Sequence, residues 1–292
     1  MLKTVAIYSK ESNSKTIEGV TRLIREFLKR SIKIQLYQKS IDPNSFKEGD
    51  PVERFTDLSS LESLPDLVLS VGGDGTFLET VLKVRSYGIP VAGVNTGRMG
   101  FLANISEDEI SHSIDLLCQG EYEIIERSML EITSPPDLFN KETATALNEI
   151  TIQKADPSMI TISVFVNGIY LNTYWADGLI VSTATGSTAY NLSVGGPILS
   201  PGDESIIISP ISPHNLTIRP IVISGSSELK MTVEGRAEEY LATCDFRSKR
   251  LSFNQELHIV RSSQKLNTVM LEGRDFYSTL RNKLMWGADR RN

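Results

Sequence analysis

Cysteine is scarce in this sequence, and the two cysteines that are present lie far apart. They are Cys118 and Cys244 in a chain of 292 residues. Two isolated cysteines exclude a disulfide scaffold, and they lack the close spacing of a zinc site. The three histidines show no metal-ligand spacing either. We therefore predict no metal held by protein side chains, and we interpret the cysteines as reduced thiols of a cytoplasmic protein.

Long apolar runs and an excess of positive charge are also missing. No stretch approaches the roughly 20 apolar residues that span a bilayer, and residues 1–8 resemble a first strand rather than a signal peptide. The net charge of −6 argues against a general nucleic-acid binder, which needs a basic face. The composition is that of a soluble globular protein. We expect no nucleic-acid or membrane partner, so backbone amides, metal ions and a few local cations must hold any phosphates.

Strand and helix patterns alternate over the first hundred residues. Apolar residues recur at helical spacing from Ile17 to Leu28, and residues 77–87 form a second helical pattern stopped by Gly88. The polar segment 38–65 is interpreted as an exposed loop with at most some helix. Four apolar runs predict strands: 5–8, 32–36, 67–71 and 89–94. Repeated β-α-β order predicts a parallel sheet that binds ligands at the carboxyl ends of its strands.

The pattern changes after one more predicted helix. Residues 106–109 resemble a capping box that opens this helix, which extends to about Cys118. Residues 159–174 alternate around Asn167-Gly168, which is a strong β-hairpin signal. Further β-rich segments lie near 146–153, 178–183, 206–209, 216–223, 228–233 and 256–261. We predict an α/β nucleotide-binding domain over 1–120 and a mostly β domain over 121–267. The tail, 268–292, is predicted to be helical at 276–284 and to pack back on the first domain.

A glycine-rich turn, Gly72-Gly73-Asp74-Gly75-Thr76, joins a predicted strand to a helix near Phe77. Glycine lets a backbone approach a ligand closely, and the N–H groups of a helix N-terminus favour phosphate. A carboxylate such as Asp74 repels phosphate unless a metal intervenes, or unless it takes a proton from a hydroxyl. The alternative is that Asp-Gly simply makes a tight turn.

A second glycine-containing loop, 95–103, follows the strand at 89–94. Arg98 has a guanidinium that suits phosphate, although an exposed arginine on a turn is the alternative. Phe101 suits stacking on a base, and a core position is the alternative.

Two later segments are rich in polar groups. Asn148 offers the donor and acceptor that reading an adenine edge requires, and Glu149 suits a metal ion or a ribose hydroxyl. A bulge or turn in the strand is the alternative for this pair. The run 175–191 places five serine and threonine side chains, two glycines and Asp177 around a short apolar strand. Its small donors and flexible backbone suit phosphate and ribose oxygens.

Together these segments resemble the NAD kinase family over about residues 67–223, in the same order and at similar separations. The first motif alone is shared with diacylglycerol and sphingosine kinases, and phosphofructokinases carry a related sequence. The later segments are far more specific. The motifs are Gly72-Gly73-Asp74-Gly75-Thr76, Asn95-Thr96-Gly97-Arg98-Met99-Gly100-Phe101, Asn148-Glu149, and Asp177-Gly178 through Thr185-Gly186-Ser187-Thr188-Ala189-Tyr190-Asn191.

The resemblance implies transfer of the γ-phosphoryl of ATP, or of polyphosphate in some members, to the 2′-hydroxyl of the adenosine ribose of NAD. It implies a β-sandwich second domain, Mg²⁺ or another divalent metal as cofactor, and Asp74 as the base. Asp177 matches a position that often serves a neighbouring subunit, so a homodimer or homotetramer with shared active sites is expected. The expected nucleotide and substrate contacts are Gly73, Gly75, Thr76, Arg98, Phe101, Asn148, Glu149, Asp177, Thr185, Thr188, Ala189, Tyr190 and Ser193.

One run departs from the family pattern. Many members carry Asp-Gly-Gln or a related run where this chain has Cys244-Asp245-Phe246-Arg247, so the resemblance assigns no role to Asp245. Two competing readings remain. A lipid kinase of the diacylglycerol type needs a basic or amphipathic membrane-facing surface, which the acidic balance disfavours. A non-catalytic dinucleotide sensor would not need Asp74.

Overall fold

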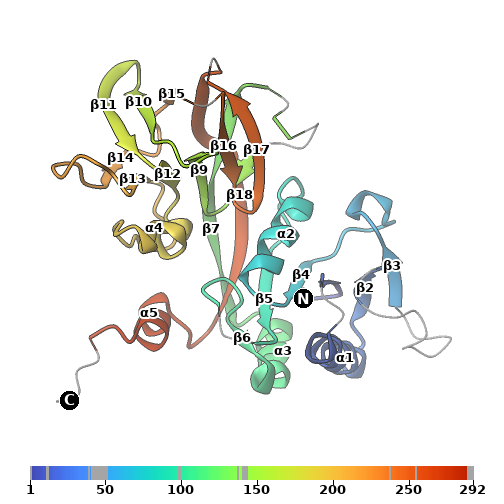
Figure 1. Cartoon of the computed structure of the whole chain (residues 1–292). Helices are drawn as coiled ribbons and strands as arrows, with labels where there is room; N and C mark the ends of the chain where they lie inside the picture. Colours follow the sequence, from blue (N-terminus) through green and yellow to red (C-terminus); the bar gives the residue numbers. More distant parts are fainter. Residues whose placement is uncertain are drawn as a thin grey trace. The chain divides into compact units, whose positions relative to one another are not determined.

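The computed structural model of the chain describes residues 2–10, 13–38, 40, 52–97, 100–136, 138–139, 144–236, 238–253 and 255–287. The chain separates into two compact units (Figure 1). Unit 1 comprises Met1–Glu126 and Leu266–Asn292, and unit 2 comprises Arg127–Lys265. Two long strands, β7 (Tyr122–Ser134) and β18 (Leu257–Leu271), carry the chain out of unit 1 and back into it. None of the described helices is long and apolar enough to cross a bilayer.

Unit 1 is built on a parallel sheet with the strand order β3-β2-β1-β4-β5. Side chains alternate along each strand. Leu69 therefore packs with helices α1 and α3, whereas Ser70 faces α2 and accepts a hydrogen bond from Thr80. The elements of unit 1 are β1 (Thr4–Tyr8), α1 (Ser14–Lys29), β2 (Lys33–Tyr37), β3 (Val52–Phe55), β4 (Leu67–Val71), α2 (Asp74–Val84), β5 (Val91–Asn95), β6 (Ile105–Ser106), α3 (Ile110–Gln119) and α5 (Phe276–Leu284). The strand order reverses between β1 and β4, which is where α/β sheets bind ligands.

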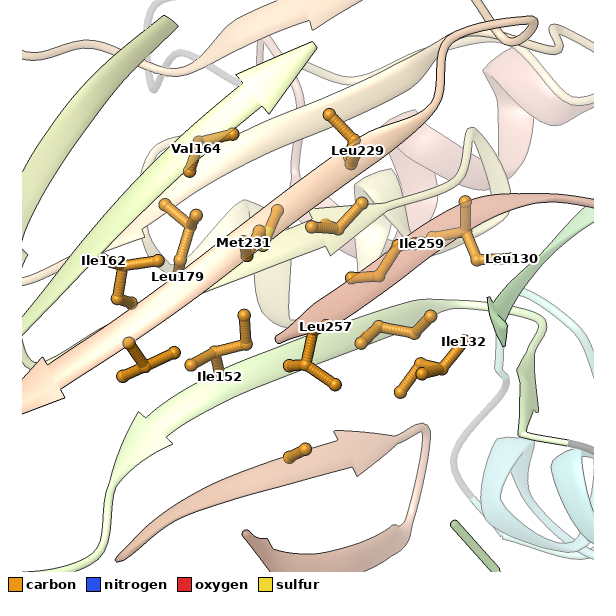
Figure 2. Packing of buried hydrophobic residues seen from close by; sticks show 14 of the residues in the cluster. Leu130, Ile132, Ile152, Ile162, Val164, Leu179, Leu229, Met231, Leu257 and Ile259 are labelled. Atoms are coloured by element: carbon orange, nitrogen blue, oxygen red, sulfur yellow. The ribbon is translucent and has the colours of Figure 1, made fainter. Parts of the chain in front are cut away.

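Unit 2 is a β-sandwich. One layer has the strand order β14-β13-β12-β9-β16-β17, and the other contains β11, β10, β15 and the first part of β18. Figure 2 shows side chains of both layers in one core, among them Met231, Leu179 and Ile152. The elements are β8 (Thr145–Ala146), β9 (Glu149–Lys154), β10 (Ile160–Val166), β11 (Ile169–Ala176), β12 (Gly178–Ser182), α4 (Tyr190–Ser193), β13 (Ile206–Ile211), β14 (Ile221–Ile223), β15 (Leu229–Gly235), β16 (Glu239–Cys244) and β17 (Arg247–Ser252). The predicted fold class, an α/β domain with a β-sandwich domain, is confirmed.

The predicted hairpin is confirmed in detail. Strands β10 and β11 pair in antiparallel fashion around Asn167 and Gly168. Both turn residues have positive φ, 51° and 79°, which is the backbone conformation that Asn-Gly tolerates.

Two expectations were wrong, and a third holds in part. Segment 38–65 is not simply a loop, because β3 pairs with β2 and a short 3-10 helix follows at Leu58–Ser60; residues 39 and 41–51 lie outside the described residues. Helix α2 begins at Asp74, not near Phe77, because the helical turn already includes the glycine-rich motif. The predicted capping box is half formed, because the Glu109 carboxylate accepts the backbone N–H of Ser106, whereas the Ser106 hydroxyl caps no backbone N–H. A 3-10 turn begins there, and α3 ends at Gln119, next to the predicted end.

The sequence patterns also missed β7, β16 and β17, and the larger part of β18. These segments carry many charged side chains on their exposed face, so their apolar residues are too few to form a continuous run. Only three residues of the predicted segment 216–223 form a strand, β14.

Candidate functional site

A cavity of about 420 Å³ lies at the carboxyl ends of β1, β4 and β5 in unit 1. It is lined by residues 13–15 at the start of α1, by Gly73 before α2, and by residues 95–97 after β5. Asn13 caps α1 by accepting the N–H of Thr16 at 2.9 Å. Two helix N-termini therefore face one space, which Lys15 also lines, and such a space suits an anionic group.

The floor of this cavity has a free polar group. Asn95 is buried, and its Oδ1 accepts the N–H of Gly97 at 2.6 Å. Its Nδ2 has no hydrogen-bond partner among the described residues. Such a buried donor is costly unless a ligand or water accepts from it. Sequence reasoning included Asn95 in the second motif without giving it a role, and it did not single out Lys15, although an Asn-Ser-Lys run before a helix is a recognisable N-cap signal.

Asp74 lies in the first turn of α2, and its carboxylate faces the loop that follows β5. Its Oδ2 accepts the N–H of Phe101 at 2.9 Å, and its Oδ1 accepts those of Leu102 and Ala103 at 3.1 and 3.0 Å. Gly100 permits this contact, because a Cβ there would overlap the Asp74 carboxylate. Two predicted segments, the glycine-rich turn and the 95–103 loop, are thus brought together. The turn alternative does not explain these bonds.

The other residues of the first motif differ in their surroundings. Gly72 has φ of 150°, and a Cβ there would clash with the buried Thr76. Gly73 and Gly75 are exposed, and a Cβ at either would meet nothing within 4 Å. The first glycine is therefore required by the fold, while the other two leave open space beside the backbone. Arg98 lies outside the described residues.

Phe101 is not a core residue. Its ring is partly exposed and lies 6.5 Å from that of Phe276 on α5, centroid to centroid. The ammonium of Lys283, also on α5, lies 4.4 Å from the centroid of the Phe101 ring. The C-terminal helix thus contributes a cation next to the loop that Asp74 holds.

In unit 2, Asp245 repeats the contact made by Asp74. It occupies the turn between β16 and β17 with φ of 52°, and its carboxylate accepts the N–H groups of Leu147, Asn148 and Glu149 at 2.8, 2.8 and 3.2 Å. Burial raises the pKa of the Asp245 carboxyl, against the effect of these donors and of Arg247. Asp245 therefore fixes the segment that carries the predicted Asn-Glu pair.

Glu149 is a second buried carboxyl with a raised pKa. Burial, and then the charge of Asp245, raise its pKa to about 8, while the backbone N–H of Tyr190 has the opposite effect. Its Oε2 is buried without a hydrogen-bond partner among the described residues. At neutral pH the side chain is therefore largely a neutral acid that lacks one partner, and a perturbed group of this kind is a candidate for ligand binding.

Asn148 lies in the bend between β8 and β9, as the turn alternative predicted, whereas Glu149 is the first residue of β9. The carbonyl of Asn148 accepts the N–H and the hydroxyl of Thr183, at 2.9 and 3.2 Å. Gly186 is required next to it, because a Cβ would overlap that carbonyl. The backbone of Asn148 is thus fully engaged, which fixes where its side-chain amide lies.

The predicted segment after β12 forms a 3-10 helix, Thr185–Thr188, followed by α4. Thr185 is buried, and its hydroxyl accepts from the guanidinium of Arg127 at 3.2 Å. Thr188 and Ala189 are partly exposed, and Tyr190 and Ser193 are exposed. The structure thus places this segment against Glu149, through Tyr190, and adds Arg127, which the sequence patterns did not indicate.

Asp177 lies at the opposite end of β12 from Thr185, although the Tyr190 hydroxyl accepts from Gln153, which pairs with Gly178 next to Asp177. Asp177 precedes β12, whereas Thr185 follows β12, and the five residues of that strand separate the two by roughly 16 Å. The carboxylate of Asp177 forms an ion pair with Lys154 at 2.6 Å.

A dedicated metal site is not found in the described part of the chain. No three His, Cys, Asp or Glu side chains there lie close enough to hold an ion together. The donor set around Asp74 consists of backbone N–H groups and Lys283, which repel a cation. The described residues therefore do not fit a metal held by the protein alone.

Two family models match the chain. The ATP-NAD kinase N-terminal domain matches residues 10–122, and the ATP-NAD kinase C-terminal domain matches residues 147–271. A curated NAD kinase from Flavobacterium psychrophilum is 38% identical over 99% of this chain and 99% of its own length. An NAD kinase from Bacteroides fragilis is 41% identical over 93% of this chain and 88% of its own length.

Solved structures agree with these matches. An NAD kinase from Archaeoglobus fulgidus in complex with ATP has a TM-score of 0.72 at 26% identity, over 97% of both chains. Yeast NADH kinase complexed with NADH has a TM-score of 0.86 at 22% identity, over 99% of this chain and 89% of that one, which is a likeness of fold.

Proposed function

Since the chain belongs to the NAD kinase family and is an enzyme of that type, we propose that it transfers the γ-phosphoryl of ATP to the 2′-hydroxyl of the adenosine ribose of NAD. The products are NADP and ADP. The observation that carries this proposal is the cavity at the starts of α1 and α2, with Asp74 in the first turn of α2. It combines an anion-binding space with a carboxylate that can accept a proton.

The cavity of unit 1 is proposed to hold phosphate groups of ATP, the ligand in the Archaeoglobus fulgidus structure. The N–H groups of two helix starts and the ammonium of Lys15 would contact the phosphate oxygens. Mg²⁺ is proposed to arrive on the phosphates as magnesium-ATP, because the described residues offer no metal cluster. Polyphosphate is the alternative donor. Arg98 is proposed to contact a phosphate as well.

Asp74 is proposed to be the general base. A carboxylate has about four lone-pair sites, and backbone N–H groups use three of them, two on Oδ1 and one on Oδ2. Oδ2 keeps one site for the ribose hydroxyl. As the 2′-oxygen bonds to the γ-phosphorus, the bond from phosphorus to the leaving ADP oxygen breaks and the proton passes to Asp74. Such base catalysis typically contributes about 10²–10⁴-fold.

Unit 2 is proposed to supply the NAD contacts. The Asn148 amide suits the adenine edge, and the unpartnered Oε2 of Glu149 can accept from a ribose hydroxyl. The other proposed contacts are Thr185, Thr188, Ala189, Tyr190 and Ser193, with Phe101 flanking the adenine. Asp177 is proposed to serve a second subunit of a homodimer or homotetramer. We further propose that the enzyme is cytoplasmic.

The proposal is tested by incubating the purified protein with NAD, ATP and Mg²⁺ and detecting NADP with an NADP-specific dehydrogenase. Parallel reactions replace ATP by polyphosphate, or NAD by NADH. We expect NADP with ATP and Mg²⁺. Absence of a phosphorylated dinucleotide in every reaction would contradict the proposal and would favour dinucleotide binding without turnover.

A further inference from the structure

The C-terminal helix α5 brings a lysine to the loop that Asp74 holds, and the function proposed above gives it no role. The ammonium of Lys283 lies 4.4 Å from the centroid of the Phe101 ring. The backbone N–H of that same Phe101 donates to Asp74 at 2.9 Å. Phe101 thus contacts the Asp74 carboxylate through its backbone and the Lys283 ammonium through its ring.

Lys283 has no carboxylate partner among the described residues, in contrast to two other lysines of unit 1. Lys10 is paired with Glu79, and Lys33 with Glu53. In the described part of the chain, the Lys283 ammonium makes neither a hydrogen bond nor an ion pair, and its side chain is half-buried. Burial lowers the pKa of Lys283, and the charge of Asp74 acts in the opposite direction. A half-buried cation on an aromatic face keeps its charge available, because the ring attracts it without neutralising it.

We propose that Lys283 binds an anionic phosphate oxygen of a substrate at the Asp74 loop. This inference rests on the proposed function, because that function brings the phosphate groups of a substrate next to the Asp74 carboxylate. Two negative groups at such short range repel each other unless a cation lies nearby. Lys283 is held in place by Phe101 and by the packing of Phe276 on Phe101, so its charge is already positioned before a substrate arrives.

Two sources of this phosphate are compatible with the chemistry, the triphosphate of ATP and the pyrophosphate of NAD. The competing role for Lys283 is structural, as a clamp that holds α5 against Phe101. The three roles predict different effects of removing the charge while keeping the aliphatic stem.

The test measures equilibrium binding of magnesium-ATP and of NAD, each by calorimetry, to the full-length wild type and to Lys283→Met. Methionine keeps the apolar stem and removes the charge. We expect affinity for one of the two ligands to fall roughly 10- to 100-fold, the usual effect of losing a hydrogen bond to a charged group. Weaker ATP binding would assign the contact to the triphosphate, and weaker NAD binding to the pyrophosphate.

Two further variants serve as controls. Lys283→Arg keeps the charge and should retain most of the affinity. Arg281→Met removes an exposed charge from the same helix and should leave both affinities and the melting temperature unchanged.

Unchanged binding of both ligands by Lys283→Met would overturn the inference. So would a fall in melting temperature with equal losses for both ligands and no rescue by Lys283→Arg, which is the signature of a clamp. Because binding is measured without turnover, a wild type that makes no NADP would count against the proposed function alone.

Discussion

Asp74 in unit 1 and Asp245 in unit 2 make the same kind of contact in different surroundings. Each carboxylate accepts hydrogen bonds from three consecutive backbone N–H groups of a loop remote in sequence, 101–103 in one case and 147–149 in the other. Charge-assisted bonds of this kind are stronger than neutral ones, so each aspartate fixes a loop that carries predicted site residues.

The neighbours of the two aspartates differ in charge. Asp74 lies near Lys283, whose pKa is lowered by burial, and the charge of Asp74 opposes that shift. Asp245 lies beside Glu149, and its charge, after burial, raises the pKa of that carboxyl. In unit 1 the loop held by the aspartate lies next to the Lys283 cation, and this charge suits phosphate. In unit 2 the held loop carries Glu149, a neutral acid, which suits an uncharged ribose hydroxyl.

Among variants that leave both aspartates in place, the largest effect is expected from Gly100→Ala, which breaks the contact in unit 1 without changing any charge. A Cβ at position 100 would overlap the carboxylate of Asp74, so the base must move. A displacement of about 1 Å at a reacting group can cost roughly 10²-fold in rate. We expect kcat to fall by about that factor. NAD affinity should fall less, because the contacts proposed for unit 2 stay in place and only the proposed Phe101 contact is disturbed. Wild-type kcat in this variant would show that the position of Asp74 is unimportant.

Asp245→Asn breaks the contact in unit 2. Asparagine tolerates the positive φ of this turn, so the turn itself should persist. Its amide NH₂, however, must face at least one of the three backbone donors. We expect a loss of about 1–3 kcal/mol in the free energy of unfolding, measured with denaturant, and weaker NAD binding. Asp203→Asn, which alters an exposed carboxylate that accepts only from Ser205 nearby, is the matched control. Equal effects of the two variants would contradict a special role for Asp245.

Glu149→Gln tests whether the raised pKa of Glu149 affects the stability of the protein. The pKa of Glu149 is raised to about 8, so between about pH 4.5 and 8 the folded state binds a proton that the unfolded state has lost. This side chain therefore makes the ligand-free protein less stable as pH rises through that range. Glutamine does not titrate, so the variant should lose this part of the pH dependence and be more stable than wild type at pH 8.5, by about 1–3 kcal/mol. Parallel stability curves for the two proteins would contradict the raised pKa.

Asn148→Ala should have the smallest effect. Its backbone contacts to Thr183 and Asp245 remain, so only the side-chain amide is lost. We expect the KM for NAD to rise by about tenfold with little change in kcat or in melting temperature, since one neutral hydrogen bond is worth about 1 kcal/mol. An unchanged KM for NAD would remove Asn148 from the pocket.

Local patterns predicted most of the fold. The amphipathic pattern of α1, the Asn167-Gly168 turn and the strand before Gly72 each carry their own signal over a few residues. The site was predicted as separate segments, because each motif is local. The contacts that hold these segments are not local, since Asp74 accepts hydrogen bonds from a loop 27 residues away and Asp245 from one 97 residues away. A carboxylate that accepts from backbone N–H groups leaves no signature in the partner sequence, and neither does a lysine placed on an aromatic ring by a returning helix.

The central claim is that Asp74 acts as the base, beyond holding its loop. Asp74→Asn keeps one oxygen acceptor for the loop and removes the ability to take a proton. Asp66→Asn is the matched control, because Asp66 also accepts two backbone N–H groups in unit 1, those of Lys3 and Thr4.

The measurement is the rate of NADP formation by wild type and both variants, with NAD affinity determined by calorimetry on the same preparations. We predict that Asp74→Asn loses about 10²–10⁴-fold in kcat with NAD affinity nearly unchanged, while Asp66→Asn behaves like wild type. Asp74→Asn with wild-type kcat, or with kcat and NAD affinity lost together, would contradict the account.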